Sequence, residues 1–276
     1  MKLPSFICRT LLAGGLGFLP LVLAAAQAGG DAADPKAQAA AGDALVVQVD
    51  FVVPEYKGGD KFRSPPTIDT ALAEDLAKRL QLPLRAVPAG TYPEDPPAGR
   101  GGALRLTFLR DLSNVPPHVT VVPIDYRAVP MAIMRSDTTI KRWEQLEGRK
   151  VCVAAGGNHV GTIAGRYRAL EQVHPSATDA LVALREGSCD AMVHDSTMLE
   201  ELIRYPEWKK FSARLRGNQR STLALLVPAH EQSKVATLRR VAFEWDANGY
   251  PEQLVKKTVR DIAFEVYLEQ DVPDCH

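Results

Sequence analysis

The sequence lacks an excess of charge of either sign. Its 276 residues include 33 lysines and arginines and 33 aspartates and glutamates. A protein that binds nucleic acid or a membrane surface through electrostatics needs a clustered positive excess. We therefore expect neither nucleic acid nor a membrane surface as a partner.

Patterns that carry chemistry are also scarce. The chain has no nucleophile elbow and no serine, histidine and aspartate set, which argues against an enzyme. No group of cysteines and histidines has the spacing of zinc ligands, and no internal repeat recurs along the chain. We expect no metal and no cofactor.

Long hydrophobic runs are absent after the first 28 residues. Met1–Ala28 carries Lys2 and Arg9, continues with an apolar stretch at 11–26 and ends in the small-residue pattern Ala-Gln-Ala. This order is typical of a cleavable secretory signal peptide. A membrane anchor is the alternative, but Gly and Pro interrupt a stretch that is shorter than the about 20 residues of a spanning helix. We predict an exported protein whose mature chain does not insert into membranes.

The segment 29–43 is rich in Ala and Gly and has no apolar period, so we interpret it as a flexible leader. Removing 28 of 276 residues leaves 248, with 31 basic and 33 acidic residues after the two basic residues of the signal are subtracted. A chain of this size can form one large domain or two lobes of about 120 residues each.

From Ala44 on, short β-rich runs alternate with helical patterns, which is typical of an α/β fold with largely parallel sheets. The patterns predict strands at 45–53, 82–87, 104–109, 119–122, 150–155, 189–193 and 221–227, with a longer apolar run at 126–134. They predict helices at 70–80, 143–146, 156 to about 173, 176–186, 195–205, 233–248, 251–257 and 261–269. A loop rich in Pro and Gly, 89–102, has no helical period.

Two features that follow predicted strands could bind a ligand. Gly156, Gly157 and Asn158 form a turn at the start of a helix, where free backbone N–H groups favour an anion. Thr162 lies in the same helix start. Asp195 lies at the carboxyl end of a strand, the edge at which open α/β sheets bind ligands. The alternatives are a turn that only reverses the chain and an aspartate that only caps a helix.

The residues from Trp143 to Leu202 resemble a known family. The run WEQLEGRKVCV, the glycine-rich turn and the run DALVALREGSCDAMVHD are similar to the bacterial extracellular solute-binding proteins of family 3. These are periplasmic receptors for polar amino acids and opines that serve ABC transporters. Thr67–Leu80 and Val241–Leu254 are similar to other helices of that family.

The resemblance implies the periplasmic-binding-protein-like type II fold, with two α/β lobes, a central cleft and two crossing hinge strands. Lobe one would comprise 44–133 and 229–276, and lobe two 134–228. It also implies a periplasmic, monomeric protein that captures a small polar, amino-acid-like ligand by hinge closure. The partner would be the permease of an ABC transporter.

The resemblance also assigns roles to single residues. The family's glycine-rich turn holds the ligand carboxylate, and the acid at the position of Asp195 pairs with the ligand ammonium group. Tyr56 falls where an aromatic ring often packs on the ligand, and Asp69 where an acid opens a helix. An ordinary tyrosine and a helix N-cap are the alternatives. His159 and His194 flank the expected cleft.

One family residue has no counterpart. The family places an arginine that binds the ligand carboxylate through two hydrogen bonds, and a gapless alignment puts Pro116 at that position. Arg110 has the family's spacing from Thr107, but using it would shift the alignment into a strand. Because no point charge reproduces the paired geometry of an arginine, we expect an atypical first lobe and an atypical ligand.

Cys152 and Cys189 match positions at which some family members carry cysteines, and they lie in strands that a parallel arrangement makes neighbours. We expect a disulfide in an oxidising compartment. Two buried free thiols are the alternative, and Cys275 is left over.

Two other functions on the same fold stay open. A sensory or partner-binding protein without a transport role would suit the altered first lobe. A periplasmic dehydratase-like enzyme would use an acid of the cleft, with Glu55 or Asp195 as candidates.

Overall fold

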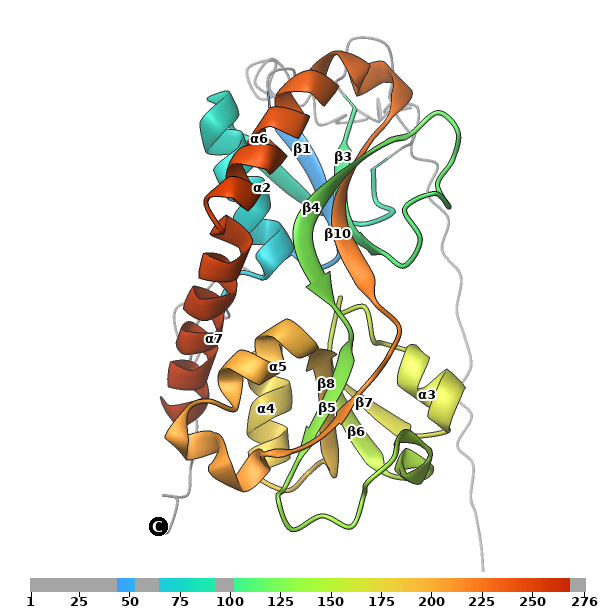
Figure 1. Cartoon of the computed structure of the whole chain (residues 1–276), viewed down its shortest axis with the longest axis vertical. Coiled ribbons are helices and arrows are strands. Elements are labelled where there is room, and N and C mark those ends of the chain that lie inside the picture. The colour runs from blue at the N-terminus through green and yellow to red at the C-terminus, as the bar shows by residue number, and fades with distance from the viewer. Residues whose placement is uncertain (1–43, 53–64, 93–101, 269–276) are drawn as a thin grey trace, which may run out of the picture.

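The structure is a computed structural model that describes residues 44–52, 65–92 and 102–268 (Figure 1). The expected signal peptide and leader lie outside these residues, as do Tyr56, Glu55 and Cys275. None of the helices in the described part of the chain is long and apolar enough to cross a membrane.

Two mixed five-stranded sheets form the centres of two lobes, one above the other in Figure 1. The first sheet has the order β2-β1-β3-β10-β4. Its strands are β1 (Leu45–Val49), β2 (Leu84–Pro88), β3 (Leu104–Leu109), β4 (Thr120–Ala128) and β10 (Ser221–Val227). The second sheet has the order β7-β6-β8-β5-β9. Its strands are β5 (Pro130–Met134), β6 (Lys150–Ala154), β7 (Leu170–His174), β8 (Ala191–Asp195) and β9 (Ala213–Arg216).

Helices cover both sheets, as expected for strands that are apolar on both faces. They are α2 (Ile68–Leu80), α3 (Thr162–Tyr167), α4 (Ala177–Arg185), α5 (Ser196–Leu202), α6 (Val235–Ala247) and α7 (Tyr250–Leu268), with short 3-10 turns at Trp143–Leu146, Pro206–Phe211 and Ala229–Lys234. The apolar stripe of α2, with Leu72 and Leu76, is buried. Ser176 caps α4 by accepting a hydrogen bond from the Asp179 N–H.

Two segments connect the lobes. The chain leaves the first sheet after Ala128 and enters the second at Pro130, and it returns between Arg216 and Ser221. The crossings touch, because the Gly217 N–H donates to the Pro130 carbonyl oxygen at 2.7 Å. The two-lobed fold predicted from the sequence is confirmed. The expected lobe boundaries lie further along the chain than these sheet changes and stay a prediction.

The longest helix, α7, packs against helices of both lobes, α2 and α6 of the first and α4 and α5 of the second. Figure 1 shows it running along one side of the molecule past the junction of the lobes. The sequence prediction of two separate helices, 251–257 and 261–269, is wrong. One buried stripe with Val255, Val259 and Ile262 continues through the expected break, and no Gly or Pro interrupts it.

A second correction concerns the region after α3. The predicted helix from 156 to about 173 is wrong, because α3 ends at Tyr167 and β7 follows. Arg168 ends the helix in the left-handed conformation, with φ at +54°. β7 then pairs in parallel with β6 at the edge of the sheet. An edge strand of five residues with exposed Leu170 and Val173 carries little burial pattern, which explains the error.

Candidate functional site in the cleft between the lobes

A cavity of about 100 Å³ lies between the lobes. It is smaller than the about 300–1,000 Å³ of typical ligand pockets, so the two lobes stand close together. The first lobe contributes Asp50, Phe51, Pro65–Asp69, Phe108 and Tyr126, the second lobe Ala154–His159, Ser176–Thr178, His194, Asp195 and Met198, and α7 contributes Val255, Thr258 and Ile262.

The cavity brings together five of the residues predicted from the sequence. Asp69, Gly156, Gly157, Asn158 and Asp195 all line it. Their common position follows from the fold, because the loops at the carboxyl ends of the strands meet between the lobes.

Two other predicted residues lie elsewhere. Thr162 and Arg110 line a neighbouring pocket of about 700 Å³. Pro116, at the family's arginine position, is an exposed loop residue. The described lining of the cavity contains no lysine and no arginine. Among the described residues, a ligand carboxylate would therefore have no arginine partner in this cavity.

The glycine-rich turn makes a close contact between the lobes. Gly156 has φ at +68°, and a Cβ atom there would lie 2.4 Å from Cβ of Phe51 and 2.7 Å from the carbonyl oxygen of Asp50. Only glycine combines this left-handed conformation with so close an approach. Among the described residues, the backbone N–H groups of Asn158 and His159 have no hydrogen-bond partner.

The sequence analysis predicted a ligand-binding helix start here, but the N–H groups at the start of α3 already have an acceptor within the chain. The Glu171 carboxylate accepts hydrogen bonds from the N–H groups of Gly161, Ile163 and Ala164 at 2.7–2.8 Å. The Thr162 hydroxyl donates to the His159 carbonyl at 2.6 Å. The chain therefore supplies its own anion at this helix start, and only the turn before it remains available.

Asp195 is buried, with 6% of its surface exposed, and already has partners. Its Oδ1 lies 3.0 Å from Nε2 of His159, and the Tyr126 hydroxyl donates to Oδ2 at 3.4 Å. Burial opposes ionisation, but the His159 hydrogen bond and the nearby His194 and His159 rings hold the Asp195 pKa below its ordinary value. The side chain does not cap α5. Because Tyr126 belongs to the first lobe, this network joins the two lobes.

Asp69 lies in the first turn of α2 and is also buried. Its carboxylate accepts hydrogen bonds from the Thr67 hydroxyl, from the Thr70 N–H at 3.0 Å and from the Asp50 N–H at 3.1 Å. These bonds fix the helix start against the end of β1. Asp69 thus has a structural role and sets the negative potential around Asp50.

Asp50, which the sequence analysis missed, has fewer side-chain hydrogen-bond partners than Asp69 and Asp195, the other two acids of the cavity. Burial and the charge of Asp69 raise its pKa from 3.8 to about 6, against the lowering effects of Arg105 and of the Thr107 hydroxyl. Thr107 donates to the carboxylate at 3.3 Å. Within the described part of the chain, Asp50 has no ion-pair partner within 4.0 Å.

Two further groups face the cavity. The Thr178 hydroxyl at the start of α4 is fully buried and has no hydrogen-bond partner among the described residues. An unpaired buried hydroxyl is costly, so this group is suited to a bound polar molecule. Burial lowers the pKa of His194 from 6.5 to about 4, and its Nδ1 accepts the Asp195 N–H at 2.8 Å. His194 is therefore neutral at pH 7.

Comparisons with known proteins bear on the fold. No family model matches the chain, and no curated protein matches its sequence. A mutant of ArgBP from T. maritima is 17% identical, with a TM-score of 0.53 over 82% of this chain and 98% of that chain. An ancestral cationic amino acid solute binding protein is 16% identical, with a TM-score of 0.52 over 81% and 98%. A histidine kinase sensor domain with similarity to periplasmic binding proteins is 18% identical, with a TM-score of 0.51 over 78% and 95%.

Identities this low establish the arrangement of the chain and not its ligand. The match nevertheless extends over nearly the full length of each similar protein. In this chain the fold consists of two mixed β-sheets, each covered by helices, with a junction between them. The chain therefore has the two-lobed fold of the periplasmic solute-binding proteins.

Proposed function

We propose that the protein is an exported solute-binding receptor whose lobes close on a small polar ligand that carries a cationic group. The observation that carries this proposal is the cavity between the lobes, where the Asp50 carboxylate has no ion-pair partner within 4.0 Å among the described residues. A buried or half-buried charge is costly unless it is paired. A cationic group of the ligand would supply the pair.

The other polar groups of the cavity suit the rest of such a ligand. The unpaired Thr178 hydroxyl and the N–H groups of Asn158 and His159 can bind an oxygen atom. An amino-acid-like solute would place its ammonium group at Asp50 and its oxygens at these donors. Asp195, which the sequence analysis assigned to the ammonium group, would first have to lose its His159 partner.

Delivery to an ABC transporter in the periplasm is the role that the sequence resemblance implies, and the fold shared with ArgBP and with an ancestral cationic amino acid solute binding protein is compatible with it. A sensory role is the second candidate, and the likeness to a histidine kinase sensor domain favours it. The two roles share the ligand-binding step. They differ in the partner that recognises the closed form.

A thermal-shift screen with amines, amino acids and carboxylic acids tests the proposal. A solute present at 100 times its dissociation constant adds about 2.7 kcal/mol to the free energy of unfolding, which raises Tm by about 5–10 °C for a chain of this size. We expect amine-bearing solutes to produce the shift and plain carboxylic acids not to. The absence of a Tm shift with every solute of a broad library would contradict a receptor function.

Asp50→Asn tests the assigned position of the cation. We expect affinity for the amine ligand to fall about tenfold to a hundredfold, because a hydrogen bond to a charged group contributes roughly 1.5–3 kcal/mol. Asp137→Asn is the matched control, since Asp137 is an exposed aspartate of the second lobe. If calorimetry showed unchanged affinity in Asp50→Asn, the assignment of the cation to Asp50 would be wrong. The proposed receptor function would not be affected.

The raised pKa of Asp50 makes a further prediction, on pH. The cation binds the ionised carboxylate, so affinity should be constant well above pH 6 and fall as the pH drops through about 6. The stability of the ligand-free protein should depend on pH in the opposite direction. The folded state binds the Asp50 proton more tightly than the unfolded state, so the contribution of Asp50 to the free energy of unfolding is lost as the pH rises from 3.8 to about 6. Calorimetry at pH 5 and pH 7.5 would show the change in affinity, and Asp50→Asn should abolish this dependence.

A further inference from the structure

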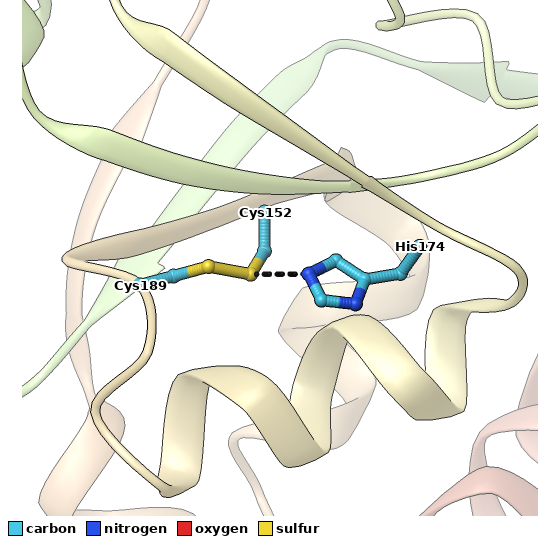
Figure 2. A group of neighbouring side chains, drawn as sticks. All are labelled: Cys152, His174 and Cys189. Carbon is cyan, nitrogen blue, oxygen red and sulfur yellow. Dashed lines mark hydrogen bonds between the residues drawn. A yellow bond between two sulfur atoms is a disulfide. The ribbon is translucent and has the colours of Figure 1, made fainter. Parts of the chain in front are cut away.

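Three side chains with metal-binding atoms gather beside the second sheet, at Cys152, His174 and Cys189 (Figure 2). The cysteines form the predicted disulfide, with 5.8 Å between their Cα atoms. His174 Nε2 lies 3.0 Å from Sγ of Cys152, and Figure 2 shows the imidazole edge directed at that sulfur. The two sulfurs and one ring nitrogen all lie within 4.8 Å of one another.

The fold assembles this cluster from segments that are far apart in the sequence. In the parallel pairing of β6 and β7, Cys152 is opposite Gln172, and Ala154 is opposite His174. Because side chains two residues apart share one face of a strand, Gln172 and His174 both point to the side of Cys152. Cys189 follows α4 and comes just before β8, which also neighbours β6.

We propose that reduction of the disulfide turns Cys152, Cys189 and His174 into a binding site for a thiophilic metal ion, with Zn²⁺ as the probe. A dithiol reductant supplies two electrons and two protons, the S–S bond breaks, and the reductant closes to its own disulfide. The metal ion then displaces the two thiol protons. Two thiolates and one imidazole provide three of the four ligands of a tetrahedral zinc site.

The geometry requires only small movements. Zinc lies about 2.3 Å from sulfur and about 2.0–2.1 Å from nitrogen, so tetrahedral ligands are spaced by roughly 3.5–3.8 Å. The donor atoms already lie within 4.8 Å of one another, and the released sulfurs can separate by side-chain rotation. The backbone of β6 and β7 can therefore stay in place.

A metal ion can reach the cluster, and a ligand for its fourth coordination position is available. Cys152 and Cys189 are buried, whereas His174 and Gln172 are partly exposed, so an ion can approach from the side of β7. The Gln172 Oε1 atom lies 3.0 Å from Sγ of Cys189. It can orient a water molecule that occupies the fourth position. The His174 carbonyl oxygen accepts the Ala155 N–H at 2.8 Å, which holds this end of β7 next to β6.

The test uses the purified protein reduced by a dithiol, freed of reductant under anaerobic conditions and titrated with Co²⁺ and then Zn²⁺. We expect one ion per chain, a sulfur-to-cobalt charge-transfer absorption band, and displacement of Co²⁺ by Zn²⁺. The oxidised protein should show no such band. His174→Ala should bind Zn²⁺ at least about tenfold more weakly, as expected when a ligand or its support is lost.

His118→Ala is the matched control, because His118 is an exposed histidine of the first lobe away from the cluster, and its affinity should equal that of the wild type. Circular dichroism before and after addition of Zn²⁺ shows whether each reduced protein keeps its fold. The proposal is overturned by equal affinities of His174→Ala and wild type, by the absence of a charge-transfer band, or by a reduced protein that unfolds and does not refold with Zn²⁺.

Discussion

Replacing Gly156 with alanine is expected to weaken ligand binding by about tenfold to a hundredfold while each lobe stays folded. The added Cβ would lie 2.4 Å from Cβ of Phe51 and 2.7 Å from the Asp50 carbonyl oxygen, across the junction of the lobes. Both neighbours are fixed to the backbone of the first lobe, so they cannot rotate aside. Overpacking of this kind costs roughly 1–3 kcal/mol, which opening of the cleft would relieve.

Gly148→Ala separates this effect from backbone strain. Gly148 has nearly the same φ, +67° against +68°, but a Cβ there would meet nothing within 4 Å. Both variants should lose about 1–2 kcal/mol of stability from the left-handed conformation. Only Gly156→Ala should lose affinity and show a larger radius of gyration by small-angle scattering. Equal affinities of the two variants would mean that closure does not need this contact.

Asp50 was missed because the end of the first strand was predicted too far along the chain. The prediction extended the first strand through 53, which placed Asp50 inside it, whereas β1 ends at Val49. The rule that identified Asp195, that ligands bind at the carboxyl ends of strands, applies equally to Asp50. The hydrophobic pattern of the sequence does not mark where the strand ends, because the apolar residues Phe51 and Val52 follow Asp50.

The hydrogen bonds at the start of α3 could not be predicted for a different reason. Glu171 reaches the start of α3 because β7 pairs with β6 and returns beside that helix. The sequence placed residue 171 in a helix, where its side chain would have pointed elsewhere. In the same way, the His159–Asp195 pair depends on the path of a turn, and turn geometry is not encoded in a periodic pattern.

The disulfide, by contrast, could be predicted from the expected strand order together with the family resemblance. A parallel arrangement makes the strands near Cys152 and Cys189 neighbours, and the observed order β7-β6-β8 confirms it. The same order also brings β7 and its His174 to the cysteines. That contact was invisible in the sequence because β7 itself was missed.

Trp245→Ala is expected to cost about 3–5 kcal/mol of stability, the usual range for a fully buried tryptophan. Trp245 is 0% exposed in α6, and its ring stacks on Tyr250 with 6.3 Å between centroids. Its Nε1–H donates to Asp75 Oδ2 of α2 at 2.7 Å. Truncation would leave a cavity between the two helices and remove a partner from the Asp75 carboxylate. Urea denaturation followed by circular dichroism would measure the loss.

Two further variants divide that loss into its parts. Trp245→Phe keeps most of the ring volume and removes the indole donor, so we expect a loss of about 1 kcal/mol. Phe243→Ala removes an aromatic ring from the same helix at a position that is 73% exposed, and we expect a change within about 0.5 kcal/mol. Since Trp245 ties α6 to α2, and Asp69 of α2 holds the end of β1, losing this packing should also loosen the strand end that carries Asp50. If Trp245→Ala resembled Phe243→Ala, the contact between α6 and α2 would not belong to the cooperatively folded core.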